Sequence, residues 1–195
     1  QVMKLPFEKF DGVLLTHEHY DHVGGIDDLR PFSRFGAVDL YMERHLENVL
    51  KERMPYCFTP LRYKGVPDIN VKTINSYKSF SIGSVEITPI RVLHHKLPIL
   101  GFRINDFAYL TVKTIPEPEY EKLKGLDTLV INSLRKSEHI SHLSLSQSID
   151  ISRRIGAKST YFTHMSHEMG LHSNIDKELP TGIYFAYDGL EITSL

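Results

Sequence analysis

The sequence has few of the features that would tie the protein to an oxidising compartment, a membrane or a nucleic acid. It contains one cysteine, Cys57, which excludes an internal disulfide and favours a reducing, cytoplasmic location. No apolar run approaches the roughly 20 residues that cross a bilayer, and the first ten residues lack the apolar segment of a signal peptide. The formal net charge is -1, so composition provides no basic excess for a long polyanion. We therefore expect neither membrane insertion nor nucleic-acid binding.

The composition that is present is that of an ordinary globular protein. The chain has 195 residues, of which 41% are hydrophobic and 24% charged, and we expect one domain over residues 1–195. Apolar strand-like segments alternate with amphipathic helical ones, which favours the α/β class. We expect helices over 43–54 and 145–155, and strands over 10–16, 38–42, 85–93, 101–104, 107–111, 126–131, 160–163, 184–187 and 190–192.

Two helix starts have the spacing of a capping box, in which the N-cap side chain and the side chain three residues later each bind the other's backbone N–H. The two pairs are Thr114 with Glu117 and Ser144 with Gln147. We expect a short helix after the first pair. The second pair should begin a longer helix that ends at Gly156.

Histidine is abundant, with eleven in the chain, and three of them lie in the stretch VLLTHEHYDHVGG. His17, His19, Asp21 and His22 follow an apolar segment within six residues. Neutral imidazoles and a carboxylate suit Zn, Mn or Fe better than Ca or Mg, which prefer oxygen ligands. Four ligands this close together cannot easily close around one tetrahedral ion. They fit two neighbouring ions, each completed by residues from elsewhere.

Two more histidine pairs stand at or near the ends of strand-like segments. His94 and His95 follow the segment 85–93, and His164 follows the segment 160–163 with His167 close behind. In open α/β sheets, ligands bind outside the carboxyl ends of the strands. Histidines from the three segments can therefore converge although they lie far apart in the sequence.

The stretch THEHYDH resembles the signature of the metallo-β-lactamase superfamily. The later stretches HHKLPILGFRI, SHLSLSQSI, FTHMSHEMGLH and AYDGLEI are similar to the branch of metal-dependent hydrolases that contains the PhnP-like cyclic phosphodiesterases. The resemblance covers nearly the whole chain. It implies a four-layer αβ/βα sandwich with a dinuclear metal site at one edge.

The resemblance also implies a role for each histidine cluster. It assigns His17, His19 and His94 to one divalent ion, either Zn or Mn with Fe as a further candidate, and Asp21, His22 and His164 to the other. His94 is preferred to His95 because the family ligand stands two residues before a lysine, here Lys96, and because His94 directly ends the strand. His142 matches a family histidine that acts on the substrate as a proton donor or transition-state partner, just ahead of a capped helix.

The sequence departs from the family at a strand end where members carry a metal-bridging aspartate in a segment like YLTD. Here the segment reads AYLTVKTIP, so Val112 follows Thr111 directly. Either one residue is missing from the sequence as read, or the chain truly lacks the aspartate and its dinuclear site is impaired. We favour the first, since deleting one residue at a strand end would disturb the register beside it.

A second departure is at the amino terminus, where family members carry further strands before the first motif. We expect the chain to lack that segment, which in this branch can hold a cysteine cluster for a structural zinc. The family's partner of those cysteines is the second histidine of a THxSH motif. Here it is His167, which we expect to have served such a zinc in the complete protein.

These features favour a hydrolase that uses a metal-activated hydroxide on a small phosphodiester, with Asp21 also orienting the nucleophile and His142 protonating the leaving group. Hydrolysis of a thioester or lactone and processing of transfer RNA are alternatives within the superfamily. A non-catalytic binding protein with a degenerate site is the alternative outside enzymes. Family members often dimerise, so a homodimer is one oligomeric state that the resemblance allows, and the sequence leaves that state open.

Overall fold

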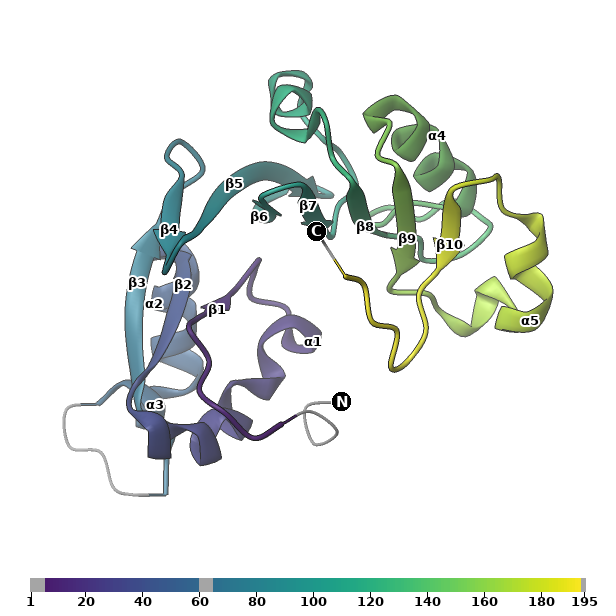
Figure 1. Ribbon diagram of the computed structural model, residues 1–195. Helices are drawn as coiled ribbons and strands as arrows, with labels where there is room; N and C mark the ends of the chain where they lie inside the picture. The colour runs from purple at the N-terminus through teal and green to yellow at the C-terminus, as the bar shows by residue number, and fades with distance from the viewer. Residues whose placement is uncertain (1–5, 60–64, 194–195) are drawn as a thin grey trace. The chain divides into compact units, whose positions relative to one another are not determined.

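The computed structural model describes residues 6–59 and 65–193 of the chain (Figure 1). The chain divides into two compact units, residues 1–84 and residues 85–195. Each unit has its own buried apolar core. The single domain expected over 1–195 stays a prediction, because this division does not test whether the units fold together.

The first unit is built on a parallel three-stranded sheet in the order β1-β2-β3. In β2, Val38, Leu40 and Met42 are buried and alternate with partly exposed residues, which is the period-two pattern of a strand with one covered face. Strand β4 ends the unit. Its strands and helices are β1 (Val13–Leu14), α1 (Tyr20–Val23), η2 (Gly24–Phe35), β2 (Val38–Glu43), α2 (Arg44–Arg53), α3 (Pro55–Phe58), β3 (Ile69–Ile74) and β4 (Phe80–Ile82).

Within the described residues, the second unit has six strands, in the order β10-β9-β8-β7-β6-β5. Strands β5, β6 and β7 are antiparallel neighbours, whereas β7, β8, β9 and β10 run parallel. Every strand except β6 therefore has its carboxyl end at the same edge of the sheet, and we call this the carboxyl edge. The strands are β5 (Val85–His94), β6 (Leu97–Ile104), β7 (Phe107–Leu110), β8 (Thr128–Asn132), β9 (Ser159–Thr163) and β10 (Ile183–Phe185).

Helix α4 (Leu145–Ile155) packs against β8, and both of its ends follow from the sequence (Figure 1). Ser144 Oγ accepts a hydrogen bond from the backbone N–H of Gln147, and the Gln147 side chain accepts one from the backbone N–H of Ser144. At the other end Gly156 has φ 71, the left-handed conformation that favours glycine. The capping box and the helix end expected from the sequence are confirmed. A cap of this kind stabilises a helix by about 1 kcal/mol.

The other expected capping box is wrong. The short helix that follows it is η3 (Glu117–Leu123), a 3-10 helix whose N-cap is Pro116 and which has no side-chain cap. Thr114 instead pairs with Leu93 of β5 in an isolated antiparallel bridge, in which the backbone N–H of each residue donates to the carbonyl oxygen of the other. The remaining helices, η4 (His167–Met169), α5 (His172–Ile175) and η5 (Asp176–Glu178), lie between β9 and β10.

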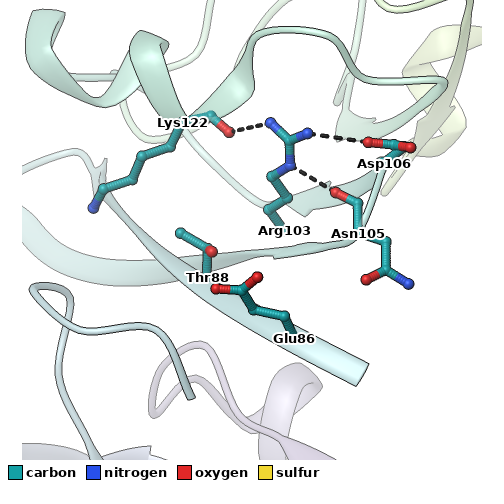
Figure 2. Close-up of a pocket in the computed structure, with 6 residues that line it drawn as sticks. All are labelled: Glu86, Thr88, Arg103, Asn105, Asp106 and Lys122. Carbon is teal, nitrogen blue, oxygen red and sulfur yellow. Dashed lines mark hydrogen bonds and ion pairs between the residues drawn. The ribbon is translucent and has the colours of Figure 1, made fainter. Parts of the chain in front are cut away.

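A two-residue turn joins β6 to β7 at the edge of the sheet opposite the carboxyl edge, and an arginine side chain binds this turn. Residues Asn105 and Asp106 connect β6 to β7, with Ile104 paired to Phe107. Figure 2 shows the Arg103 guanidinium donating to the carbonyl oxygens of Asn105 and Lys122 and lying against the Asp106 carboxylate. These residues line an open hollow of about 510 Å³ together with Glu86 and Thr88.

The guanidinium of Arg103 thus has structural partners, which connect the turn to η3. The hollow that it lines lies at the amino end of β5, whereas His94 is at the carboxyl end. No helix in the described part of the chain is long and apolar enough to cross a membrane.

Candidate metal centre

The first unit gathers four candidate metal ligands in the segment that links β1 to η2. His17 is 2% exposed, and its ring centroid lies 4.7 Å from that of His19 and 4.2 Å from that of His22. His22 Nε2 lies 3.2 Å from Asp21 Oδ2. His19 is the N-cap of α1, whose first turn carries Asp21 and His22. The local fold therefore brings all four expected ligands of this motif together, and we call them the HxHxDH cluster.

Helix α2 steadies the backbone of this cluster from within the same unit. Arg53 at the end of α2 donates from Nη1 to the carbonyl oxygen of Glu18, and His45 Nε2 lies 3.5 Å from the Glu18 carboxylate. Thr16 Oγ1 lies 2.9 Å from His17 Nδ1, within hydrogen-bonding distance. Since Glu18 stands between His17 and His19, contacts with its backbone and side chain restrict the geometry of both ligands.

The second unit presents three histidines at the carboxyl edge. His94 is the last residue of β5 and 7% exposed, and its Nε2 lies 3.2 Å from Nε2 of His142. The ring of His142 also stacks on His164, which follows β9, with centroids 4.8 Å apart. His142 therefore lies between His94 and His164, and we call these three residues the edge cluster.

Turn geometry separates His94 from His95. The two strands β5 and β6 are joined by His95 and Lys96, with His94 paired to Leu97. His95 has φ 55 and is exposed, whereas His94 is buried against His142. The geometry is consistent with the choice of His94 as the ligand. The assignment of the individual ligands stays a prediction.

His164 has an unusual backbone conformation. Its φ is 61, in the left-handed region that only a few per cent of residues other than glycine adopt, although histidine does so more often than most. A conformation of this kind costs of order 1 kcal/mol or more and clusters at functional sites, where surrounding structure holds it in place. The left-handed residue His164 directly follows the last residue of β9, so the strand ends where this histidine reaches the carboxyl edge.

No acidic side chain stands between Thr111 and Lys113, where the family carries its bridging aspartate. Val112 is fully buried in the core of the second unit, and its backbone N–H donates to Asn132 Oδ1 over 2.6 Å. The pairing of β7 with β8 runs without interruption from Phe107 to Leu110. The hydrophobic side chain of Val112 cannot ligate a metal. The two explanations for the missing aspartate both stay open.

His167, singled out from the sequence for a structural zinc, also lies in the second unit. His167 begins η4 and is exposed, while the only cysteine, Cys57, is buried in the first unit, so a structural zinc at His167 stays a prediction. Arg135 in the same unit donates from Nη1 to both carboxylate oxygens of Glu168, the residue after His167.

Sequence reasoning missed two residues near His142. The ring of His139 lies with its centroid 5.3 Å from that of His142. Lys113 donates from Nζ to the backbone carbonyl of His142 over 3.1 Å. The only signal in the sequence for His139 is the HxxH spacing with His142. Lys113 is separated from its partner by 29 residues and gave no signal at all.

Comparison with known proteins identifies the family. Residues 3–165 match the family described as the beta-lactamase superfamily domain. The chain belongs to the metallo-β-lactamase superfamily. The crystal structure of a new diphosphatase from the PhnP family is 34% identical, has a TM-score of 0.87, and is matched over 96% of this chain and 73% of that one. The chain therefore also belongs to the PhnP family within the superfamily, and the resemblance seen in the sequence is confirmed.

Two further relatives bear on this chain: one supports its fold, and the other shows how little of a relative's activity can be assigned to it. The metallo-β-lactamase fold protein YhfI from Bacillus subtilis has a TM-score of 0.77 at 20% identity, over 97% of this chain and 79% of that chain. An octanoyltransferase of Porphyromonas gingivalis is 37% identical over 193 residues, which are 98% of this chain and 39% of that protein. The chain thus spans about two fifths of that relative. The α/β class and the metallo-β-lactamase fold are confirmed, while the acyl-transfer name belongs to a much longer protein.

The side chains of both clusters fit the divalent metals that this superfamily generally binds. The predicted ligands in the two clusters are five imidazoles, with His142 set aside, and one carboxylate, and nitrogen-rich donors of this kind suit Zn, Mn or Fe. Asp21 Oδ2 and His22 Nε2 lie 3.2 Å apart, as expected of two groups that could bind the same ion. The Thr16 hydroxyl beside His17 is a neighbour of the kind that orients a metal-binding imidazole.

Proposed function

We propose that the protein is a metal-dependent hydrolase of small phosphodiesters that uses two divalent ions. The observation that carries this proposal is the edge cluster, in which a histidine outside the predicted ligand set, His142, lies between two predicted ligands. The diphosphatase activity named for the PhnP-family relative supports a phosphorus substrate.

In this proposal His17, His19 and His94 hold one ion, and Asp21, His22 and His164 hold the other. Zn and Mn are the first candidates for both ions, with Fe next. When bound, the ions would lower the pKa of a water toward neutrality and neutralise negative charge on the phosphate.

The remaining chemistry belongs to the side chains of this protein. Asp21 is 61% exposed on its side chain, so one carboxylate oxygen is accessible to accept a hydrogen bond from the attacking water and orient it. His142, protonated at Nε2, gives that proton to the alkoxide that leaves phosphorus. The oxygen of the attacking water, which has lost a proton to solvent, forms a bond to phosphorus as the P–O bond to the leaving group breaks. The products are an alcohol and a phosphomonoester, and a proton from solvent later restores His142.

A second candidate is hydrolysis of a diphosphate, because the PhnP-family relative is named a diphosphatase. The same groups would serve both reactions, since each needs a nucleophile at phosphorus and a proton for the leaving oxygen. The two differ in leaving group. A diphosphate releases a phosphate that is already a good leaving group and depends less on His142.

The test is hydrolysis of bis-p-nitrophenyl phosphate by protein reconstituted with Mn or Zn, with the metal content of each variant measured in parallel. We expect metal-dependent turnover by the wild type. Replacing a ligand from either cluster, His17→Ala or His164→Ala, should lower both metal content and turnover. His142→Ala should lower turnover of a dialkyl phosphodiester, whose alkoxide needs a proton to leave, by about 10²–10⁴-fold without removing metal. Turnover of bis-p-nitrophenyl phosphate should fall by less, because its phenolate is a good leaving group. His172→Ala is the matched control, because His172 contacts the carbonyl of Phe185 and belongs to neither cluster.

Several outcomes would contradict the proposal. Two bound ions with no turnover of the diester, but turnover of a diphosphate or of a thioester, would assign the site to that substrate instead. Affinity for transfer RNA with a steep dependence on salt would favour a nuclease. Failure to bind any metal would favour the degenerate binding protein.

The remaining expectations about partners and location also stay proposals. We propose a small phosphodiester substrate, no membrane and no nucleic-acid partner, a homodimer, and a cytoplasmic location. Sedimentation of the purified protein at two concentrations tests the dimer, since a monomer at both would exclude it.

A further inference from the structure

We infer that Lys113 is a positioning residue for His142, and this inference rests on the catalytic role proposed above for His142. Lys113 follows β7 at the carboxyl edge and has no ligand or acid–base role in that proposal. Its side chain is partly buried, and its Nζ donates to two acceptors that determine where the His142 segment lies.

The first acceptor is the backbone carbonyl oxygen of His142 itself, 3.1 Å from Nζ. The second is Oε1 of Gln147, 2.9 Å away. The same Oε1 accepts the backbone N–H of Ser144 in the capping box of α4. One ammonium group therefore restrains the backbone of His142 and the first turn of the helix that follows it. Hydrogen bonds from a charged donor are shorter and stronger than neutral ones, which suits this function.

The backbone of Lys113 is fixed to the other side of the cluster. Its N–H donates to the carbonyl oxygen of Leu93 over 2.7 Å, and the next N–H, from Thr114, donates to the same oxygen. Leu93 immediately precedes His94. Lys113 is therefore a direct connection between the end of β5, which delivers His94, and the segment that delivers His142. The 3.2 Å contact between the two imidazoles depends on both segments.

Helix stability does not explain a lysine at this position. The amino end of a helix carries a partial positive charge and favours anions, so an ammonium beside the first turn of α4 is electrostatically unfavourable for the helix. The capping box of Ser144 and Gln147 already satisfies the backbone there. The position is better explained by the alignment of His142, since displacement of a catalytic group by about 1 Å can lower a rate by about 10²-fold.

The test compares Lys113→Met with Lys122→Met in the metal-loaded enzyme, with a dialkyl phosphodiester as substrate because its alkoxide depends on the proton of His142. Lys122 is the matched control, because its Nζ also donates to a backbone carbonyl, that of Pro89, and to a carboxylate, that of Glu119, but away from the edge cluster. We expect Lys113→Met to lower kcat about 10–100-fold with KM within about twofold, and metal content to be unchanged. Lys113→Arg, which can reach the same acceptors, should restore part of kcat. Lys122→Met should leave kcat and KM as they are.

A second measurement does not depend on activity. In protein labelled at histidine, the imidazole resonance of His142 is identified by its loss in His142→Ala. Lys113→Met should shift or broaden that resonance and leave the resonance of His172 unchanged. In the His142→Ala background, Lys113→Met should lower turnover by less than about twofold, because the residue acts through His142.

The outcomes separate the two ideas. If His142→Ala is impaired but Lys113→Met has normal kcat and an unchanged His142 resonance, the inference is wrong and the proposed function stands. An equal effect of Lys113→Met with and without His142 would also overturn it. If His142→Ala has wild-type turnover, the proposed role of His142 fails. The resonance then still decides whether Lys113 orders that side chain.

Discussion

Glu47 is a carboxylate on α2 whose side chain is only 5% exposed, and its replacement tests how the helix beside the HxHxDH cluster is stabilised. It accepts hydrogen bonds from Arg44 over 2.6 Å, from Lys51 over 2.7 Å and from Thr73 on β3 over 3.1 Å. Burial raises the pKa of Glu47. Hydrogen bonds from Lys51 and Thr73, together with the charges of Lys51 and Arg44, lower this pKa by more than burial raises it. The net pKa therefore lies below its ordinary 4.5.

The expected effect of Glu47→Gln follows from the exposure of the two cations. Exposed helical ion pairs contribute about 0.3–0.5 kcal/mol each, whereas hydrogen bonds to charged groups contribute about 1.5–3 kcal/mol. The acceptor is buried, but the side chains of Arg44 and Lys51 are 65% and 49% exposed and can return to water, so about 1 kcal/mol for each pair is appropriate. The variant should therefore lose about 2 kcal/mol of unfolding free energy, or roughly 4–8 °C in Tm.

The lowered pKa of Glu47 also predicts how the stability difference between wild type and Glu47→Gln changes with pH. A carboxylate whose pKa is lowered by folding stabilises the folded state above its unfolded pKa, and this contribution is lost as pH falls through the folded pKa. The Tm difference between wild type and Glu47→Gln should thus be full at pH 7 and shrink below 4.5. Thermal unfolding of the metal-free protein, followed by circular dichroism at pH 7 and at about pH 3, measures it. Glu52→Gln, an exposed change on the same helix, is the control. An equal difference at both pH values would refute the electrostatic argument.

Three further predictions concern the second unit, and urea unfolding measures each. Ser144→Ala should lower the free energy of unfolding by about 1 kcal/mol through loss of the N-cap of α4. Thr114→Ala, at the capping box that does not form, should change it by less than about 0.5 kcal/mol. Equal losses would contradict the conclusion that only Ser144 caps a helix. Gly101→Ala should cost about 1–3 kcal/mol, since a Cβ there would lie 2.3 Å from Cδ2 of buried Leu110, and a neutral result would mean that Leu110 can move. Asn132→Ala should cost about 1–3 kcal/mol, because it leaves the buried N–H of Val112 without its acceptor, unless water enters to replace it.

The sequence predicted the elements whose pattern is local. Residues 85–93, 107–111 and 160–163 were expected as strands and are found as β5, β7 and β9, with ends shifted by one residue. Helix α2 begins and ends one residue inside the expected 43–54. These segments are apolar or amphipathic over their whole length, so the period of their burial is visible without knowledge of the tertiary structure.

Elements that depend on distant partners were missed or misplaced. Strand β3 (Ile69–Ile74) is half polar and is a strand because it pairs with β2. In η2 (Gly24–Phe35), glycines and Pro31 interrupt any helical period. The strand expected over 190–192 is absent from the described residues, where Leu190 instead donates to Tyr187 in a turn.

The candidate site divides in the same way. The HxHxDH cluster was predictable because its four side chains are neighbours in the sequence, and its rings and carboxylate do lie together. The position of His142 between His94 and His164 could not be predicted from the sequence, because it depends on the order of the strands and on the contacts of Lys113. Long-range contacts of this kind leave no periodic signal in a single sequence.

The two-residue turns at the ends of β6 restrict how this protein can evolve. Residues His95 and Lys96 close one end, and Asn105 and Asp106 close the other. An inserted residue at either place would shift the pairing and turn every following side chain of the strand to the opposite face. Lineages that acquire new substrates by lengthening loops must therefore use other connections. The segment from β8 to α4, which carries His142, and the one from β9 to β10 are not constrained by a hairpin. The carboxyl edge is therefore where sequence length can diverge most easily.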